Sequence, residues 1–237
     1  MLCCATALRE SVIARKKYLG ENIMLKNKKL SILGDSISTY QGVSNNAEAN
    51  TTIAVNPYFY RSPFPEEKTY WSLVCKEFGL ELCVNNSWSG GNLSGKEDLT
   101  AGVNRAEFLD HTNGSTPDLV ILFMGMNDLG RGFPADVFGK DYKATIATIR
   151  KEYPNAKICC VNMPNRAPYV SARTVEFNNA ILNATESFGN HCFIADLFNS
   201  KLNNDGYYMN TLDGLHPDED GMRIIAEVVI KAIKENM

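Results

Sequence analysis

Short apolar runs alternate with longer amphipathic segments along most of this chain. Each run ends at a glycine or at polar residues, which is typical of a buried strand followed by a turn. The longer segments repeat apolar residues three and four positions apart, as helices do. The pattern predicts strands near 30–33, 80–84, 119–124, 157–161 and 191–195. It predicts helices over 66–78, 98–109, 136–151, 174–188 and 217–233.

This alternation predicts an α/β fold with a five-stranded parallel sheet covered by helices on both faces. The run 119–124 is apolar at every position, as expected for a strand buried on both sides. No linker divides the chain, so we place residues 26–237 in one domain. We expect residues 1–25 to form an extension outside it; its apolar stretch is at the lower limit for a signal-peptide core and no charged segment precedes it, so it does not indicate a signal peptide.

The composition argues against a nucleic-acid-binding protein, a zinc site and a membrane-spanning segment. The chain has 237 residues, 44% of them hydrophobic, which is enough for one sizeable core. A net charge of −3 and a pI near 5.7 argue against nucleic acid as a partner. The odd number of cysteines, seven, falls partly in strand-like runs and matches no zinc spacing, which favours free thiols and a cytoplasmic location. No apolar run is long enough to span a membrane.

The first strand is followed closely by a serine. Its apolar run stops at Gly34, and Ser36 comes two residues later. In an open parallel sheet, catalytic groups lie just beyond the carboxyl ends of the strands. Ser36 is therefore a candidate nucleophile, although most turn serines serve only to form the turn.

Asp213 and His216 supply the partners that a nucleophilic serine needs. An imidazole must take the hydroxyl proton, and a carboxylate must fix its tautomer and stabilise its cation. An Asp three residues before a His can do this from one turn, and Pro217 would hold that turn at the start of the last helix. The other histidines suit ordinary structural positions, His111 on the surface and His191 at the entry to a strand.

Donors for an oxyanion hole follow three separate predicted strands. They are the Ser36 backbone N–H, a backbone N–H of the loop 89–91, and the side-chain amide of Asn127. Such donors stabilise the negative charge of a tetrahedral intermediate. Because parallel strands end at one edge of the sheet, these groups can converge there.

Four blocks of the sequence together resemble the SGNH (GDSL) hydrolase superfamily. They are Gly34-Asp35-Ser36, the loop from Asn85 to Gly90, Gly125-Met126-Asn127-Asp128, and Asp213-Gly214-Leu215-His216-Pro217. Each block is weak alone, but they occur in the order of the family and cover the chain from about residue 29 to its end.

The resemblance implies a three-layer α/β/α sandwich with a flavodoxin-like sheet and a serine esterase mechanism that uses no metal or cofactor. Position by position, it implies Ser36 as nucleophile, His216 as base and Asp213 as the residue that orients it. It also implies an oxyanion hole formed by Ser36, Gly90 and Asn127.

Two positions depart from the pattern of the family. Ile37 stands where leucine is frequent, and Ser87 stands where the second block often has its first glycine. Gly91 directly follows Gly90, so it is an alternative backbone donor.

A long polar segment at residues 39–68 bears on the substrate, because loops of this length are often functional. Its aromatics suit sugar rings, and the amides and guanidinium of neighbouring loops suit hydroxyls. We expect substrate contacts from Tyr40, Trp88, Arg131 and Asn165. The expected substrate is a small-molecule or glycan ester, most simply an acetyl ester on a carbohydrate. The alternative for the aromatics is that they pack against the loop itself.

Two other functions remain open at this point. A lysophospholipase or thioesterase would use the same three catalytic residues on a longer acyl chain. A non-catalytic flavodoxin-like binding module would also use the turn at Ser36, but it leaves Asp213 and His216 without a role.

Overall fold

The structure, a computed structural model, describes residues 25–40, 43, 64–111, 113–165, 171–204 and 210–237. The expected extension at 1–24 and most of the long polar segment lie outside these residues. Leu25, which we assigned to the extension, is 7% exposed and packs in the hydrophobic core.

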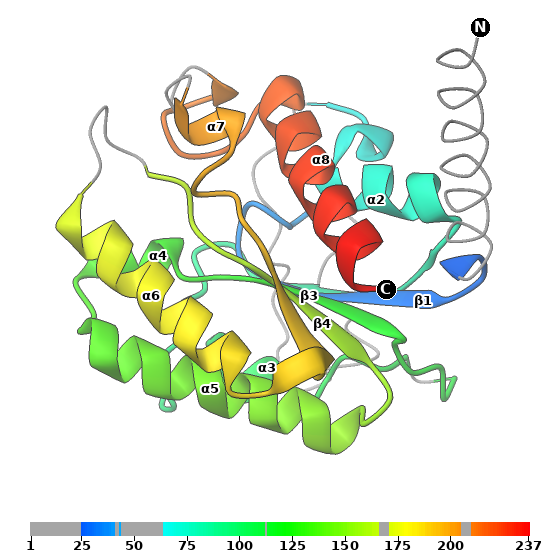
Figure 1. Cartoon of the computed structure of the whole chain (residues 1–237), viewed down its shortest axis with the longest axis horizontal. Coiled ribbons are helices and arrows are strands. Elements are labelled where there is room, and N and C mark those ends of the chain that lie inside the picture. Colours follow the sequence, from blue (N-terminus) through cyan, green and yellow to red (C-terminus); the bar gives the residue numbers. More distant parts are fainter. Residues whose placement is uncertain (1–24, 41–42, 44–63, 112, 166–170, 205–209) are drawn as a thin grey trace, which may run out of the picture.

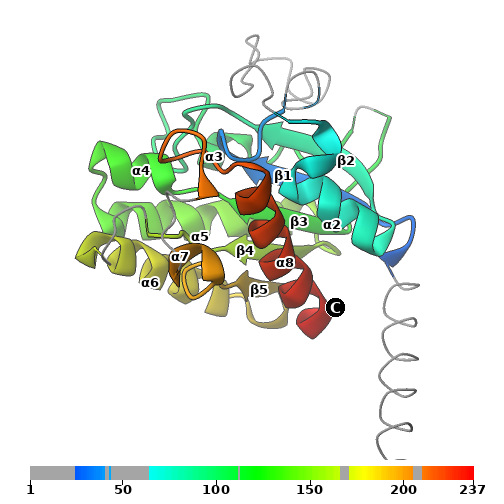
Figure 2. The ribbon, with the colours of Figure 1, turned by 90° about the horizontal axis from the view of Figure 1, so that it is seen from above.

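Five parallel strands form one sheet with the order β2-β1-β3-β4-β5 (Figures 1 and 2). Their bounds are Lys29–Gly34 for β1, Glu81–Ser87 for β2, Leu119–Phe123 for β3, Lys157–Val161 for β4 and Cys192–Ala195 for β5. The chain goes outward from β1 to β2 and then crosses back over β1 to β3. The predicted parallel α/β sheet is confirmed, and this reversal next to β1 is where such sheets place their binding sites.

Helices cover both faces of the sheet (Figure 1). One face carries α2 and α8, which contact each other, and the other carries α3, α5 and α6. The helices are α2 (Tyr70–Phe78), α3 (Gly102–Arg105), α4 (Met126–Arg131), α5 (Ala135–Glu152), α6 (Ala172–Glu186), α7 (Lys201–Asn204) and α8 (Glu219–Asn236). Short 3₁₀ turns stand at Glu66–Lys68 and Gly189–His191.

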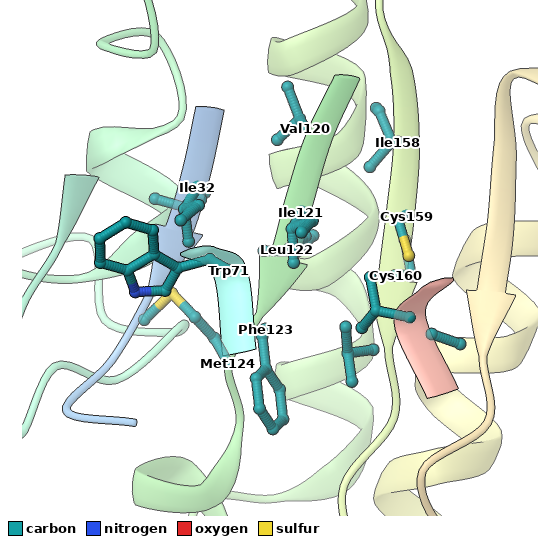
Figure 3. Packing of buried hydrophobic residues seen from close by; sticks show 14 of the residues in the cluster. Ile32, Trp71, Val120, Ile121, Leu122, Phe123, Met124, Ile158, Cys159 and Cys160 are labelled. Carbon is teal, nitrogen blue, oxygen red and sulfur yellow. The ribbon is translucent and has the colours of Figure 1, made fainter. Parts of the chain in front are cut away.

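The core lies between the sheet and the two helical layers. Every residue of β3 is buried, and its side chains meet those of β4 in Figure 3. On one face they pack against α2, whose ends are fixed by the Thr69 side chain and by Gly79 in the left-handed conformation. In α8, the Asp218 side chain accepts the Gly221 N–H at the first turn.

The second strand is longer than predicted. Polar residues 85–87, which we expected in a loop, continue β2 and are fully buried. They stay in register with β1 as far as the pair Gly34 and Ser87. Burial is tolerated because each polar side chain finds a partner, for example the Asn86 amide on the Phe108 carbonyl.

Two other predictions need correction. The helix expected over 98–109 is only the four-residue α3, because its flanks turn to make hydrogen bonds such as Arg105 to the Thr100 carbonyl. The polar residues after β3 begin a helix, α4, which the sequence pattern did not indicate because it is so short. Among the described residues, no helix is long and apolar enough to cross a membrane.

The central strand should control the stability of the fold. Ile121 lies in β3 between β1 and β4 and is 0% exposed, so Ile121→Ala removes packing contacts in the middle of the sheet. We expect a loss of about 2–5 kcal/mol in the free energy of unfolding. Urea denaturation measures this loss. Leu182→Ala is the matched control, because Leu182 lies in α6 and is 42% exposed. Equal effects of the two substitutions would contradict this account of the core.

Candidate active site

The turn after β1 holds Ser36 at the carboxyl edge of the sheet. Gly34 ends the strand without a side chain, and a Cβ there would lie 2.6 Å from the Ser38 side chain and 2.7 Å from Ser87 Oγ. Only glycine therefore lets the chain fold back this tightly. The turn is closed by the Ser38 N–H on the Asp35 carbonyl, and Ser36 is 5% exposed.

The same turn is held from the α2 side. The Ser38 carbonyl accepts hydrogen bonds from Trp71 Nε1 at 3.1 Å and Asn85 Nδ2 at 2.9 Å. The Ser38 hydroxyl also bonds the Tyr70 hydroxyl at 2.7 Å. Trp71 is 2% exposed, so it belongs to the core, while its ring N–H positions the turn. Sequence reasoning missed this role, since nothing local links Trp71 to Ser38.

His216 and Asp213 reach Ser36 from the loop before α8. His216 Nε2 lies 3.0 Å from Ser36 Oγ, and His216 Nδ1 lies 2.7 Å from Asp213 Oδ2. The His216 side chain is 12% exposed and that of Asp213 34%. The three residues therefore form a continuous hydrogen-bonded series from carboxylate to hydroxyl.

The Asp213 carboxylate is also bound by its own turn. Its Oδ1 accepts the backbone N–H groups of Leu215 and His216 at 3.0 and 2.8 Å. Burial acts to raise the pKa of Asp213, but the hydrogen bonds from His216 and Leu215 outweigh it and hold the pKa below its ordinary value. Asp213 is thus kept ionised beside the imidazole, as stabilising an imidazolium requires.

The residues after β2 and β3 meet at this edge. Asn127, in the first turn of α4, donates from Nδ2 to the Gly91 carbonyl at 2.9 Å, and its distance to Asp35 Oδ2 is 3.5 Å. The Gly91 N–H donates to the Trp88 carbonyl. In the part of the chain that the structure describes, the N–H groups of Ser36 and Gly90 donate to no protein acceptor.

A buried charged group underlies the turn. Asp35, Arg105 and Asp128 are at most 2% exposed. Arg105 donates to the backbone carbonyls of Gly34 and Asn86, and Asp128 accepts backbone N–H groups of the loop after β2. These contacts join the ends of three strands. No local pattern in the sequence indicates these contacts, because the partners are 19 to 71 positions apart.

Burial shifts the ionisation of this group. Desolvation raises the pKa of Asp35 to about 7, against the opposing effects of the Ile37 N–H and the Arg105 charge. Desolvation likewise lowers the pKa of Arg105 to about 9, opposed by Asp35 and Asp98. Burial also raises the pKa of Asp128. For each of the three side chains, the loss of solvation of the charged form outweighs the hydrogen bonds and opposite charges that favour that form.

The four expected substrate contacts lie at different places. The Tyr40 hydroxyl donates to the Phe64 carbonyl, so Tyr40 ties together the described ends of the long segment. Trp88 is half-buried beside β2. Arg131 is exposed at the end of α4, where its Nη1 donates to Asn92 Oδ1 at 2.9 Å.

Asn165 lies in the wall of a pocket next to the histidine turn. The pocket has a volume of about 330 Å³, and its wall combines apolar and polar groups: Met126, Leu129, Gly130, Asn165, Ser171, Thr174 and Gly214. Asn165 itself is 4% exposed and accepts the Ser171 N–H. Gly214 comes two residues before His216, which places the pocket on the imidazole side of the site.

The remaining histidines lie elsewhere. His191 is exposed before β5 and lies 3.5 Å from Arg150, and His111 closes a turn with Asn113. Among the described residues, no group of histidine, cysteine, aspartate and glutamate side chains is arranged to hold a metal ion.

The sequence matches the model of the GDSL-like Lipase/Acylhydrolase family over residues 32–224. The chain belongs to this family. The match covers more than half of the chain and includes Ser36, Asn127 and His216. This GDSL hydrolase is therefore an enzyme that acts on ester bonds. A comparison with curated proteins found no match.

Solved structures share the fold of this GDSL hydrolase. A GDSL-like lipase candidate from Bacteroides uniformis is 24% identical, with a TM-score of 0.65 over 86% of this chain and 94% of that one. A carbohydrate esterase family 2 enzyme from Corynascus thermopiles is 21% identical, with a TM-score of 0.62 over 88% and 66%. A family two carbohydrate esterase from Clostridium thermocellum, solved with cellohexaose, is 17% identical, with a TM-score of 0.66 over 89% and 64%.

The raised pKa of Asp35 predicts a pH-dependent stability. A folded-state pKa above the unfolded one gives stability that is complete below about pH 4 and lost as the pH rises towards about 7. At 1.36 kcal/mol per pKa unit, the Asp35 contribution falls by about 4 kcal/mol. Urea denaturation between about pH 4 and pH 7 should show that the free energy of unfolding falls less with rising pH in Asp35→Asn than in the unmodified protein. Asp136→Asn, at an exposed position, serves as the control. If the free energy of unfolding fell as steeply in Asp35→Asn as in the unmodified protein, Asp35 would not be the source of the pH dependence.

Proposed function

We propose that Ser36 is the nucleophile of a metal-independent serine esterase, with His216 as its base and Asp213 as the residue that orients His216. The observation that carries this proposal is the hydrogen-bonded series from Asp213 through His216 to Ser36 Oγ. Ser36 Oγ attacks the ester carbonyl carbon while Nε2 takes its proton. The imidazolium then protonates the leaving alcohol, and water hydrolyses the acyl-enzyme with the same base.

The oxyanion of the tetrahedral intermediate would be held by three donors from three strand ends. They are the N–H groups of Ser36 and Gly90 and the Asn127 amide. Gly90 is favoured over Gly91, because the Gly91 N–H is already occupied by the Trp88 carbonyl. Asn127 Nδ2 has two N–H groups: one donates to the Gly91 carbonyl at 2.9 Å and holds the amide in place, and the other makes only a long contact of 3.5 Å with Asp35 Oδ2, which the oxyanion would replace.

For the substrate we propose a short-chain ester, most simply acetyl, on a carbohydrate alcohol. Because the imidazole protonates the leaving group, the alcohol belongs on the His216 side, where the pocket of about 330 Å³ offers hydroxyl and amide groups over a small apolar floor. The carbohydrate esterases with the same fold support this choice by analogy. The free thiols of the five described cysteines support a cytoplasmic site of action.

Removing the nucleophile tests the mechanism. Ser36→Ala should lower the turnover of nitrophenyl acetate by at least about 10³-fold and abolish labelling by a fluorophosphonate probe, because in the proposed mechanism Ser36 Oγ is the atom that forms the acyl-enzyme. The exposed Ser187→Ala provides the matched control. A well-folded Ser36→Ala protein that is still labelled and still turns over the ester would exclude Ser36 as nucleophile.

A panel of acyl chain lengths tests the substrate. If the acyl group is acetyl as proposed, kcat/KM for nitrophenyl esters should be highest for acetyl and fall by about tenfold or more by octanoyl. A methylene group that does not fit the site gains none of the roughly 0.8 kcal/mol that its burial would contribute to binding. Forcing it into the site adds steric strain. Acetylated sugars should release acetate in the same assay series. A maximum at long chains would instead favour the lysophospholipase or thioesterase alternative.

A further inference from the structure

We infer that Arg131 forms a subsite for a carboxylate carried by the substrate, next to the oxyanion hole. This inference rests on the proposed function and goes further, because it assigns a charge to the substrate. Four observations carry it: the face of α4 on which Arg131 lies, its anchor, its distance from Gly90 and its lack of an acidic partner.

Arg131 shares a helix face with the proposed oxyanion donor. Asn127 and Arg131 are four residues apart in α4, so their side chains leave the helix in the same direction. Both reach the same loop after β2. Asn127 binds the Gly91 carbonyl, and Arg131 Nη1 binds Asn92 Oδ1 at 2.9 Å. One helix face therefore presents both the amide and the guanidinium to this edge.

The guanidinium is fixed close to Gly90. Asn92, its anchor, is only 6% exposed and is thus a well-held acceptor. Arg131 Nη2 would lie 3.5 Å from a Cβ placed on Gly90, which has a φ of +74°. Because Gly90 carries no side chain, nothing from this residue stands between the guanidinium and the proposed backbone donor.

Arg131 has no acidic partner among the residues that the structure describes. By contrast, Arg223 on α8 pairs with Asp220 and Glu227. Within the described part of the chain, Nη1 is the one Arg131 nitrogen that makes a hydrogen bond, so other N–H groups of the planar fork remain available. A fork of this kind binds a carboxylate by two parallel charge-assisted hydrogen bonds, which are stronger than bonds to a neutral hydroxyl.

The carboxylate can stand on either side of the scissile bond. It can end a short dicarboxylic acyl group, or it can belong to the alcohol, as in an acetylated uronic acid. The chemistry at Arg131 is the same in both cases, so the experiment has one arm for each.

The test compares matched charged and neutral esters. The acyl arm uses nitrophenyl hemisuccinate and its methyl ester, and the alcohol arm uses acetylated methyl glucuronoside and its methyl ester. In at least one arm, kcat/KM should favour the carboxylate by about tenfold, as expected for a charge-assisted pair. Added salt should reduce this preference.

Variants then assign the preference to Arg131. Arg131→Met should bring the charged-to-neutral ratio close to one, and Arg131→Lys should restore part of it, because it returns the charge without the fork. Arg150→Met, at the opposite edge of the sheet, is the control and should keep the full ratio. The ratio is informative even if a variant lowers all rates.

Two results would overturn the inference. One is a charged-to-neutral ratio near one in both arms for the unmodified protein, and the other is a preference that persists in Arg131→Met. Neither affects the proposed function, which instead fails if neutral esters are not turned over and Ser36 is not labelled by a fluorophosphonate probe.

Discussion

The hydrogen bond between His216 and Ser36 joins residues 180 positions apart, and the site depends on it. It forms only if β1 delivers Ser36 to the carboxyl edge and the loop before α8 returns to the same place. Both ends are held independently of the bond itself. The Ser36 turn is fixed by Trp71 and Asn85 on the Ser38 carbonyl, and the histidine turn is fixed by backbone donors on Asp213. The proposed catalytic geometry is thus set before any substrate binds.

Three charged side chains are buried next to the Ser36 turn, and their burial is electrostatically unfavourable. Asp35, Arg105 and Asp128 are buried where their charged forms are poorly solvated, and desolvation shifts the pKa of each against its charge. In return, the group ties the ends of β1, β2 and β3 together through backbone carbonyls and N–H groups. An apolar core at this position could not bind those backbone groups. Stability is exchanged here for a fixed arrangement of three strand ends.

The short helix α4 carries both the proposed oxyanion donor and the proposed carboxylate-binding residue. Its first turn carries Asn127 and its last turn carries Arg131, and both bind the loop that contains Gly90 and Gly91. On its other side, Met126 and Leu129 contribute to the pocket beside Gly214. On the roles proposed above, a helix of this kind can adjust what the enzyme accepts while the proposed oxyanion donor stays in place, because the two residues lie one turn apart.

The sequence by itself determined the layout of the fold and the chemical types at the site. Periodicity marked all five strands, and the parallel order placed Ser36, Gly90 and Asn127 at one edge, because parallel strands end together. Only the tertiary structure decided that residues 85–87 continue β2, that α3 is short and α4 exists, and that Arg105 is buried. It also showed that the Gly91 N–H donates to the Trp88 carbonyl, which is the observation that favours Gly90 as the proposed donor. These features depend on hydrogen bonds between distant residues, and a local pattern carries no information about such partners.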